Sequence, residues 1–162
     1  MIFSFFFFLF FSFFSVLGYG LIFNKIFNLK FENLNLGKIG ILGLFFLTVI
    51  SSFTHIFMPH NFIHNIFFIS LGFFYFIYIF FIGKVSKQKI YYLSIIFILL
   101  LSGLILAKNN EDFSYYHLPN TIQFFEQKLQ FGLGNLNHGF KHISSIFLLN
   151  SIFIFPKIKY FL

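Results

Sequence analysis

Four long apolar runs dominate the chain and predict four membrane-spanning helices. They cover residues 2–23, 39–57, 62–82 and 90–107. A helix needs about 20 apolar residues to cross roughly 30 Å of hydrocarbon, and each run reaches or approaches that length. Helices are the open-ended structure that satisfies every backbone polar group inside a bilayer. The pattern therefore predicts an all-α, polytopic membrane helix bundle with about four transmembrane helices.

The two ends of the chain need separate interpretation. Residues 2–23 have no basic start and no small-residue cleavage site, so they predict a retained span rather than a signal peptide. Residues 143–155 are too short to favour a span, and we expect an interfacial or re-entrant helix there. The final "PKIKYFL" is typical of the approach to another span. We therefore expect the chain to be the N-terminal part of a larger protein.

Lysine positions predict the orientation of the bundle. Loops 24–38 and 83–89 each hold three lysines, whereas the "MPHN" connection at 58–61 holds none. Lysine-rich loops stay in the cytoplasm, so the N-terminus, the "MPHN" turn and loop 108–142 are expected to face outward. All six histidines and three of the four acidic residues then fall on the outer side. We therefore expect the reactive groups to collect at the outer membrane face.

This topology divides the chain into three predicted parts. Residues 1–107 form the four-span bundle, residues 108–142 form an extracytoplasmic loop, and residues 143–162 form an interfacial or truncated segment. The composition agrees with this division, since 59% of the residues are hydrophobic and only 9% are charged. A soluble domain carries about 25% charged residues. The net charge of +7 follows from the topology, so we expect membrane lipid rather than nucleic acid as a partner.

A short surface helix is predicted within the polar loop by "HLPNTIQFFEQKLQFG". Pro119 precedes Asn120, which we expect to be the N-cap, and Gln123 completes a capping box. Gly132 and Gly134 are expected to end it. One apolar face is expected to lie on the membrane surface, and it consists of Ile122, Phe125 and Leu129.

Two neighbouring acids, Glu111 and Asp112, are the candidate catalytic residues. Acids are scarce in this chain, which holds only four. A carboxylate partly removed from water has a raised pKa and can take a proton from an acceptor hydroxyl. The alternative is a solvated loop that ends a helix. Because adjacent side chains point in different directions, we expect one of the two to be essential.

Other loop residues are candidate substrate contacts. Tyr115 and Tyr116 can stack on a sugar, although anchoring at the lipid headgroups is the commoner role of interfacial tyrosine. His117 can bind a lipid phosphate or assist proton transfer, or it is simply a polar loop residue. Asn135 and His138, in "GNLNHGF", are either substrate contacts or parts of a turn.

Three further histidines, His55, His60 and His64, flank the "MPHN" turn. The spacing of His60 and His64 can bind Zn²⁺ or haem. No acidic residue completes a metal motif beside them, and the absence of cysteine excludes thiolate ligands. We therefore predict no cofactor, with a divalent cation as the alternative.

The acid pair, "SYYHLP", the surface helix and "FGLGNLNHGF" together resemble bacterial multispanning proteins of the GT-C glycosyltransferase-like type. They are similar to a group of uncharacterised polysaccharide-associated membrane proteins. The resemblance covers roughly residues 105–150. It implies a bacterial inner-membrane protein that transfers sugar from a polyprenyl-phosphate-linked donor at the outer membrane face. Glu111 or Asp112 would then be the catalytic base or a metal-proximal group.

Two departures from that family weaken the implied function. The loop follows four spans here, whereas many GT-C enzymes place it after the first. The downstream spans that complete a donor site are also missing, so we expect this chain to be inactive by itself. The alternative function is a non-catalytic membrane subunit of a respiratory or transport complex, in which the loop docks a partner.

Overall fold

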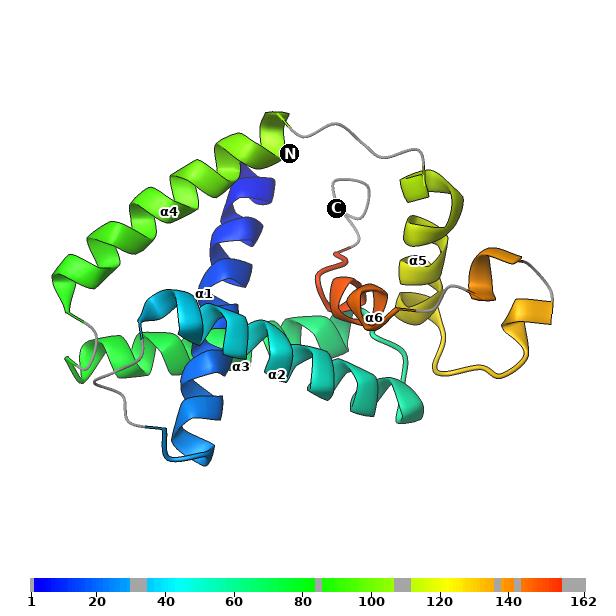
Figure 1. Ribbon diagram of the computed structural model, residues 1–162, viewed down its shortest axis with the longest axis horizontal. Coiled ribbons are helices and arrows are strands. Elements are labelled where there is room, and N and C mark those ends of the chain that lie inside the picture. The colour runs from blue at the N-terminus through cyan, green and yellow to red at the C-terminus, as the bar shows by residue number, and fades with distance from the viewer. Residues whose placement is uncertain are drawn as a thin grey trace. The chain divides into compact units, whose positions relative to one another are not determined.

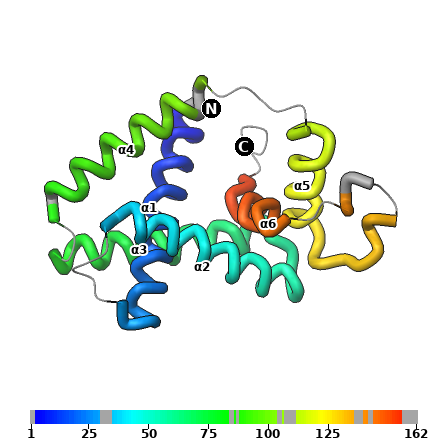
Figure 2. The backbone as a smooth tube through the Cα atoms, in the orientation of Figure 1, coloured from blue at the N-terminus to red at the C-terminus, as the bar shows by residue number. Residues whose placement is uncertain are grey.

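Every regular element in the described part of the chain is a helix. The computed structural model describes residues 2–29, 35–83, 86–106, 112–135, 138–141 and 144–155. Its long helices are α1 (Ile2–Ile26), α2 (Leu36–Phe57), α3 (Phe62–Phe81) and α4 (Lys87–Leu106) (Figure 1). The shorter elements are η2 (Phe113–His117), α5 (Leu118–Glu126), η3 (Leu133–Asn135), η4 (His138–Lys141) and α6 (Ser145–Ile152) (Figure 2). The all-α prediction is confirmed.

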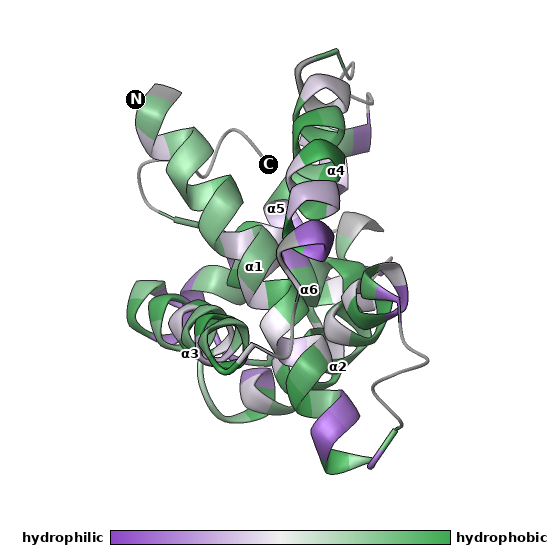
Figure 3. Ribbon diagram, turned by 90° about the vertical axis from the view of Figure 1, so that its left-hand side faces the viewer, coloured by the Kyte–Doolittle hydropathy of each residue, from purple (hydrophilic) through white to green (hydrophobic). Residues whose placement is uncertain are grey.

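Three of these helices are long and apolar enough to cross a membrane. They are α1, α2 and α3, and the part of α4 whose side chains are described adds a shorter apolar stretch, Gln88–Gly103. Hydrophobic residues colour α1 green along most of its length in Figure 3. Large apolar side chains such as Phe7 and Phe53 are more than half exposed, as a lipid-facing surface requires. These features are compatible with an integral membrane protein, and the fourth span stays a prediction.

The chain forms two compact units. Unit 1 comprises Met1–Phe46 and Ile69–Lys108, and unit 2 comprises Leu47–Phe68 and Asn109–Leu162. Helices α2 and α3 therefore each contribute residues to both units. The three predicted parts concern membrane topology, and that division stays a prediction.

Small residues allow the helices of unit 1 to approach closely. A Cβ atom at Gly18 of α1 would overlap the carbonyl oxygen of Gly72 in α3. A Cβ atom at Gly43 of α2 would likewise overlap the carbonyl oxygen of Val16. Close backbone approach at small residues is the usual way in which membrane helices pack, because lipid supplies no hydrophobic force between them.

Aromatic and aliphatic side chains fill the space around these crossings. Phe14 of α1 and Phe76 of α3 lie with ring centroids 4.9 Å apart, tilted by 48°. Such tilted ring pairs add to the free energy gained by burial. All four long helices contribute to the buried cluster, which consists of Phe14, Leu17, Leu21, Ile39, Phe76, Ile79 and Leu93.

Asparagine side chains cap the first turns of α2 and α3. The Asn35 side-chain oxygen accepts from the Lys38 N–H at 2.8 Å, at the start of α2. The Asn61 oxygen accepts from the His64 N–H at 3.0 Å, at the start of α3. Each cap satisfies one of the backbone donors that a helix start leaves free.

Helix α5 differs from its prediction in both its start and its end. Asn120 is not the N-cap, because a π-helical turn, η2, runs directly into the helix upstream of it. The Asn120 side-chain amide instead donates to the Tyr116 carbonyl at 2.7 Å. The helix ends at Glu126, before the predicted glycines. Its residues buried within the protein are Asn120, Thr121 and Phe124. The placement of Ile122, Phe125 and Leu129 on the membrane surface stays a prediction.

Helix α6 is short, as the length of its apolar run predicts. It covers the eight residues Ser145–Ile152 and packs against α5 within unit 2. The Ser144 hydroxyl caps it by accepting from the Ile146 N–H at 3.3 Å. Eight residues extend only about 12 Å, which cannot span a bilayer. Its interfacial position stays a prediction.

Candidate functional site

Unit 2 contains every histidine that the structure describes, and its chemistry lies in two places. We call residues 112–117 the tyrosine turn. We call the second place the histidine network, and it consists of Thr54, His60, His64, Asn65 and Ser151. The first collects the residues singled out by the sequence motif, and the second lies around the "MPHN" turn.

The tyrosine turn has an uncommon backbone. Phe113–His117 form a π-helix, closed by the Leu118 N–H donating to the Phe113 carbonyl. Single π-helical turns are rare and occur frequently at functional sites, because the extra residue widens the helix and redirects its side chains. In this chain, the turn includes Tyr115, Tyr116 and His117, which the sequence identified as candidate contacts.

One side of the tyrosine turn is anchored and the other is open. The ring centroids of Tyr116 and His117 lie 4.4 Å apart. The His117 ring packs edge-on against Phe147 of α6, with a centroid distance of 4.9 Å. Tyr115, in contrast, is 71% exposed, and Asp112 is exposed as well. The anchored pair therefore fixes the backbone that holds the exposed ring and carboxylate.

The structure brings some of the predicted site residues together. The π-helical turn contacts η4, which in turn contacts η3. Element η4, which begins at His138, is thus adjacent to the tyrosine turn, and Asn135 is exposed at the end of η3. Glu111 and the side chain of His138 lie outside the described residues.

In the histidine network, contacts with backbone carbonyls determine which side-chain atoms donate and which accept hydrogen bonds. The Asn65 amide nitrogen donates to the carbonyls of Ser151 and Ile154, at 2.7 and 3.1 Å. Its oxygen, 3.1 Å from His64 Nδ1, must therefore accept. His64 consequently carries its hydrogen on Nδ1, and its Nε2 accepts from the Thr54 hydroxyl at 3.1 Å.

His60 continues the same chain of hydrogen bonds. Its Nε2 lies 3.1 Å from the Ser51 carbonyl and 3.2 Å from Thr54 Oγ1. A carbonyl oxygen only accepts, so Nε2 carries the hydrogen and Nδ1 accepts from the Ser151 hydroxyl at 2.5 Å. The donors then run from Ser151 through His60, Thr54, His64 and Asn65, back to the Ser151 carbonyl.

Burial keeps His60 neutral in this circuit. The residue is fully buried, and this burial, reinforced by the neighbouring His64 and His55, lowers its pKa to about 3. Hydrogen bonds from the protonated ring to the carbonyls of Ser51 and Leu148 favour the charged form and oppose the lowering of the pKa without overcoming it. A buried cation without a counter-charge is costly, which explains why the neutral ring is favoured.

His55 lies beside this network without joining it. The centroid of its ring lies 5.0 Å from that of His60 and 4.7 Å from that of Phe124. Neither of its ring nitrogens forms a hydrogen bond with a described residue. It borders a cavity of about 40 Å³ that Lys128 also lines. A cavity of this size has room for water, which can satisfy such nitrogens.

The sequence anticipated the three histidines but not their partners. Ser51, Thr54 and Asn65 are polar positions within apolar runs, which is the signal that marks a polar site near a membrane. Ser151 comes close only through folding, 91 positions away from His60. Within the described residues, no group of three or more histidine or acidic side chains is arranged to hold a metal ion.

The comparison with protein families gives one match, which extends over residues 1–162. The matching family is described as a domain of unknown function, DUF8201, and the chain belongs to it. No curated protein and no solved structure matches the chain.

Proposed function

We propose that the chain is an integral membrane protein whose tyrosine turn binds a lipid-linked saccharide at the membrane surface. One observation carries the proposal. Exposed Asp112 and Tyr115 lie three positions apart on the tyrosine turn, whose other side is anchored by Tyr116 and His117 against neighbouring rings. An aromatic face beside a carboxylate suits a sugar, because the ring covers its C–H groups while the carboxylate accepts from its hydroxyls.

The chemistry that we propose is glycosyl transfer from a polyprenyl-phosphate sugar. The acceptor hydroxyl oxygen bonds to the anomeric carbon while the bond from that carbon to the phosphate oxygen breaks. Polyprenyl phosphate leaves, and the hydroxyl proton passes to the Asp112 carboxylate, which acts as general base. Three helices able to cross a membrane support this proposal, since they keep the protein where a lipid-linked donor resides.

The test measures glycan production in cells whose gene copy is replaced by a variant, at matched membrane levels. Asp112→Asn should lower production about 10²–10⁴-fold, as loss of a general base does. Glu126→Gln is the matched control, because Glu126 is an exposed acid outside the turn. Full production by Asp112→Asn would remove the acid–base role from this residue.

Binding provides an independent measurement that this chain alone permits. Purified protein in nanodiscs is titrated with a short-chain polyprenyl-phosphate hexose. Tyr115→Ala should weaken binding about 10-fold, which corresponds to about 1.4 kcal/mol, because it removes the ring that covers the C–H groups of the sugar. Tyr91→Ala, which removes a ring of similar exposure (65%) from α4, should leave binding unchanged.

The second candidate is a non-catalytic membrane subunit, and the exposure of Phe131 favours it. This side chain is 91% exposed, in the polar region between α5 and η3. An exposed aromatic ring is the typical centre of a protein interface. If Asp112→Asn and Tyr115→Ala both behave like the parent protein while Phe131→Ser abolishes function, the subunit proposal replaces the saccharide proposal.

A further inference from the structure

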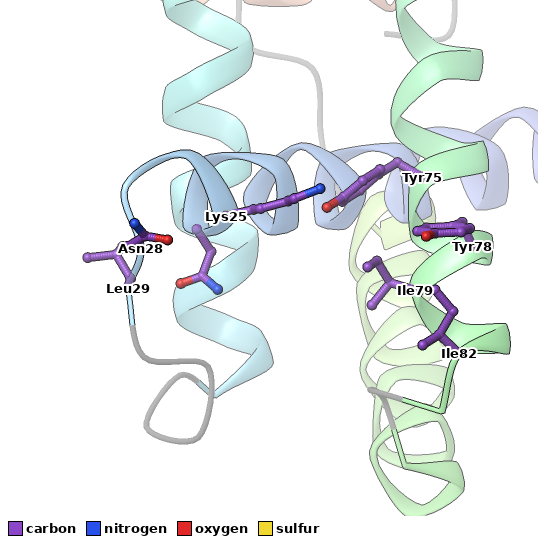
Figure 4. A pocket seen from close by; sticks show the side chains of 8 residues that line it. Lys25, Asn28, Leu29, Tyr75, Tyr78, Ile79 and Ile82 are labelled. Carbon is purple, nitrogen blue, oxygen red and sulfur yellow. The ribbon is translucent and has the colours of Figure 1, made fainter.

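Unit 1 contains a cavity of about 260 Å³ at the ends of α1 and α3. Figure 4 shows the side chains that line it. Its polar lining includes Asn24, Lys25, Tyr75 and Tyr78, and its apolar lining includes Leu29 and Ile79. The volume approaches the range of small-molecule sites, about 300–1,000 Å³. Neither the tyrosine turn nor the histidine network belongs to this unit.

Asn24 is a buried polar residue with an unused acceptor. The residue is only 1% exposed, and its side-chain oxygen has no hydrogen-bond partner among the described residues. Native structures pair nearly all buried polar atoms, so an unpaired one needs an explanation. Because Asn24 lines the cavity, a hydroxyl or ammonium group held there supplies the missing donor.

Lys25 and two tyrosines add the means to recognise an anion. Figure 4 shows the Lys25 side chain extending from α1 toward Tyr75 on α3. Tyr78 lies one turn further along α3 and also lines the cavity. An ammonium group and hydroxyl donors together bind phosphate oxygens. The cavity therefore matches a ligand that has both a phosphate and a further hydrogen-bond donor.

The surroundings of the cavity favour a lipid as the source of that phosphate. Both α1 and α3 are long and apolar enough to cross a membrane, and the cavity lies where they end. Next to it, Phe81 is 80% exposed and Ile82 is 49% exposed, which gives acyl chains an apolar surface. Tyrosine and lysine at such a position are typical of the headgroup level.

We propose that this cavity binds the headgroup of a phospholipid such as phosphatidylglycerol. Lys25, Tyr75 and Tyr78 hold the phosphate, and a headgroup hydroxyl donates to the Asn24 oxygen. The acyl chains lie along the apolar end of α3. The proposal rests on the membrane placement of α1 and α3 and is independent of the saccharide chemistry of unit 2.

Native mass spectrometry of the full chain tests the proposal. The protein is released from nanodiscs of phosphatidylcholine containing phosphatidylglycerol, and the lipid that stays bound is counted. Lys25→Gln and Tyr75→Phe should each reduce retained phosphatidylglycerol about 5- to 10-fold. Lys38→Gln is the matched control, since Lys38 is an exposed lysine of unit 1 that does not line the cavity.

The possible outcomes distinguish a bound lipid from a soluble phosphate and from general charge attraction. Equal loss in Lys38→Gln would reveal general charge attraction and overturn the proposal, as would full retention in both cavity variants. Displacement of the lipid by millimolar glycerol phosphate or inorganic phosphate would show that a soluble phosphate is the ligand. Asn24→Leu tests the donor contact, because it should lower the preference for phosphatidylglycerol over phosphatidic acid, whose headgroup lacks the glycerol hydroxyls.

Discussion

At the scale of single residues, the histidine network satisfies buried polar side chains by hydrogen bonds that hold them in one arrangement. Each of its members would be costly to bury alone, yet the circuit leaves none of their hydrogen-bonding nitrogens without a partner. Ser151 has a second acceptor, the Leu148 carbonyl, at 2.7 Å. A proton arriving at His60 Nδ1 would make that nitrogen a donor, and the Ser151 hydroxyl would turn fully to Leu148.

This arrangement predicts that unit 2 loosens in mild acid. The pKa of His60 is lowered from 6.5 to about 3 in the folded protein, so between these values the unfolded state binds more protons. Stability is therefore fully present above pH 6.5 and is lost progressively as the pH falls toward 3. Hydrogen exchange of the α6 amides, corrected for intrinsic rates, should show less protection at pH 5 than at pH 7.5.

Two variants check the origin of this pH dependence. His60→Gln removes the titrating ring, so its α6 protection should change less between the two pH values, even if it is lower throughout. His117→Gln changes a histidine outside the network that packs against Phe147 of α6, so it should lower α6 protection equally at both pH values and keep the parent pH response. If His60→Gln retains the full pH dependence, the effect comes from another group.

At the scale of elements, close helix approach in unit 1 predicts opposite effects for two glycines. Gly18→Ala places a Cβ atom against the Gly72 carbonyl, which cannot move without shifting α3. We expect a loss of about 1–3 kcal/mol, as overpacking typically costs. Gly103→Ala in α4 meets nothing within 4 Å and should be neutral or stabilise by about 0.5–1 kcal/mol.

Thermal unfolding of the purified variants in detergent measures this difference. The transition temperature should fall for Gly18→Ala and stay or rise for Gly103→Ala. A transition temperature unchanged in both variants would mean that α1 and α3 pack more loosely than the structure indicates.

The elements also show what a sequence can and cannot specify here. The long helices follow from apolar run length, so the predicted and observed limits of α3 differ by one residue at its end. The start of α5 is harder to predict. The turn before it decides whether the Asn120 side chain caps the helix or donates to the carbonyl four residues earlier. A local sequence pattern does not predict the π-helix. The hydrogen bond between His60 and Ser151 cannot be predicted locally either, because the fold brings the two residues together.

At the scale of the whole molecule, the distribution of lysine makes a prediction about orientation. The chain contains no cysteine, so single cysteines can report which side of the membrane a position faces. Gln88, at the start of α4, lies within the lysine-rich segment 83–89, whereas Gln127 follows α5. Both side chains are exposed, so reactivity depends on the compartment. The positive-inside rule places Gln88 in the cytoplasm and Gln127 outside.

An impermeant thiol reagent applied to intact cells decides the matter. Gln127→Cys should react and Gln88→Cys should not, while both should react after the membrane is opened with detergent, which is the control for accessibility. The reverse pattern would place the tyrosine turn in the cytoplasm, and saccharide transfer at the outer face would then fail. The headgroup cavity would survive that result, because it requires only that α1 and α3 end at a lipid surface, whichever leaflet that surface belongs to.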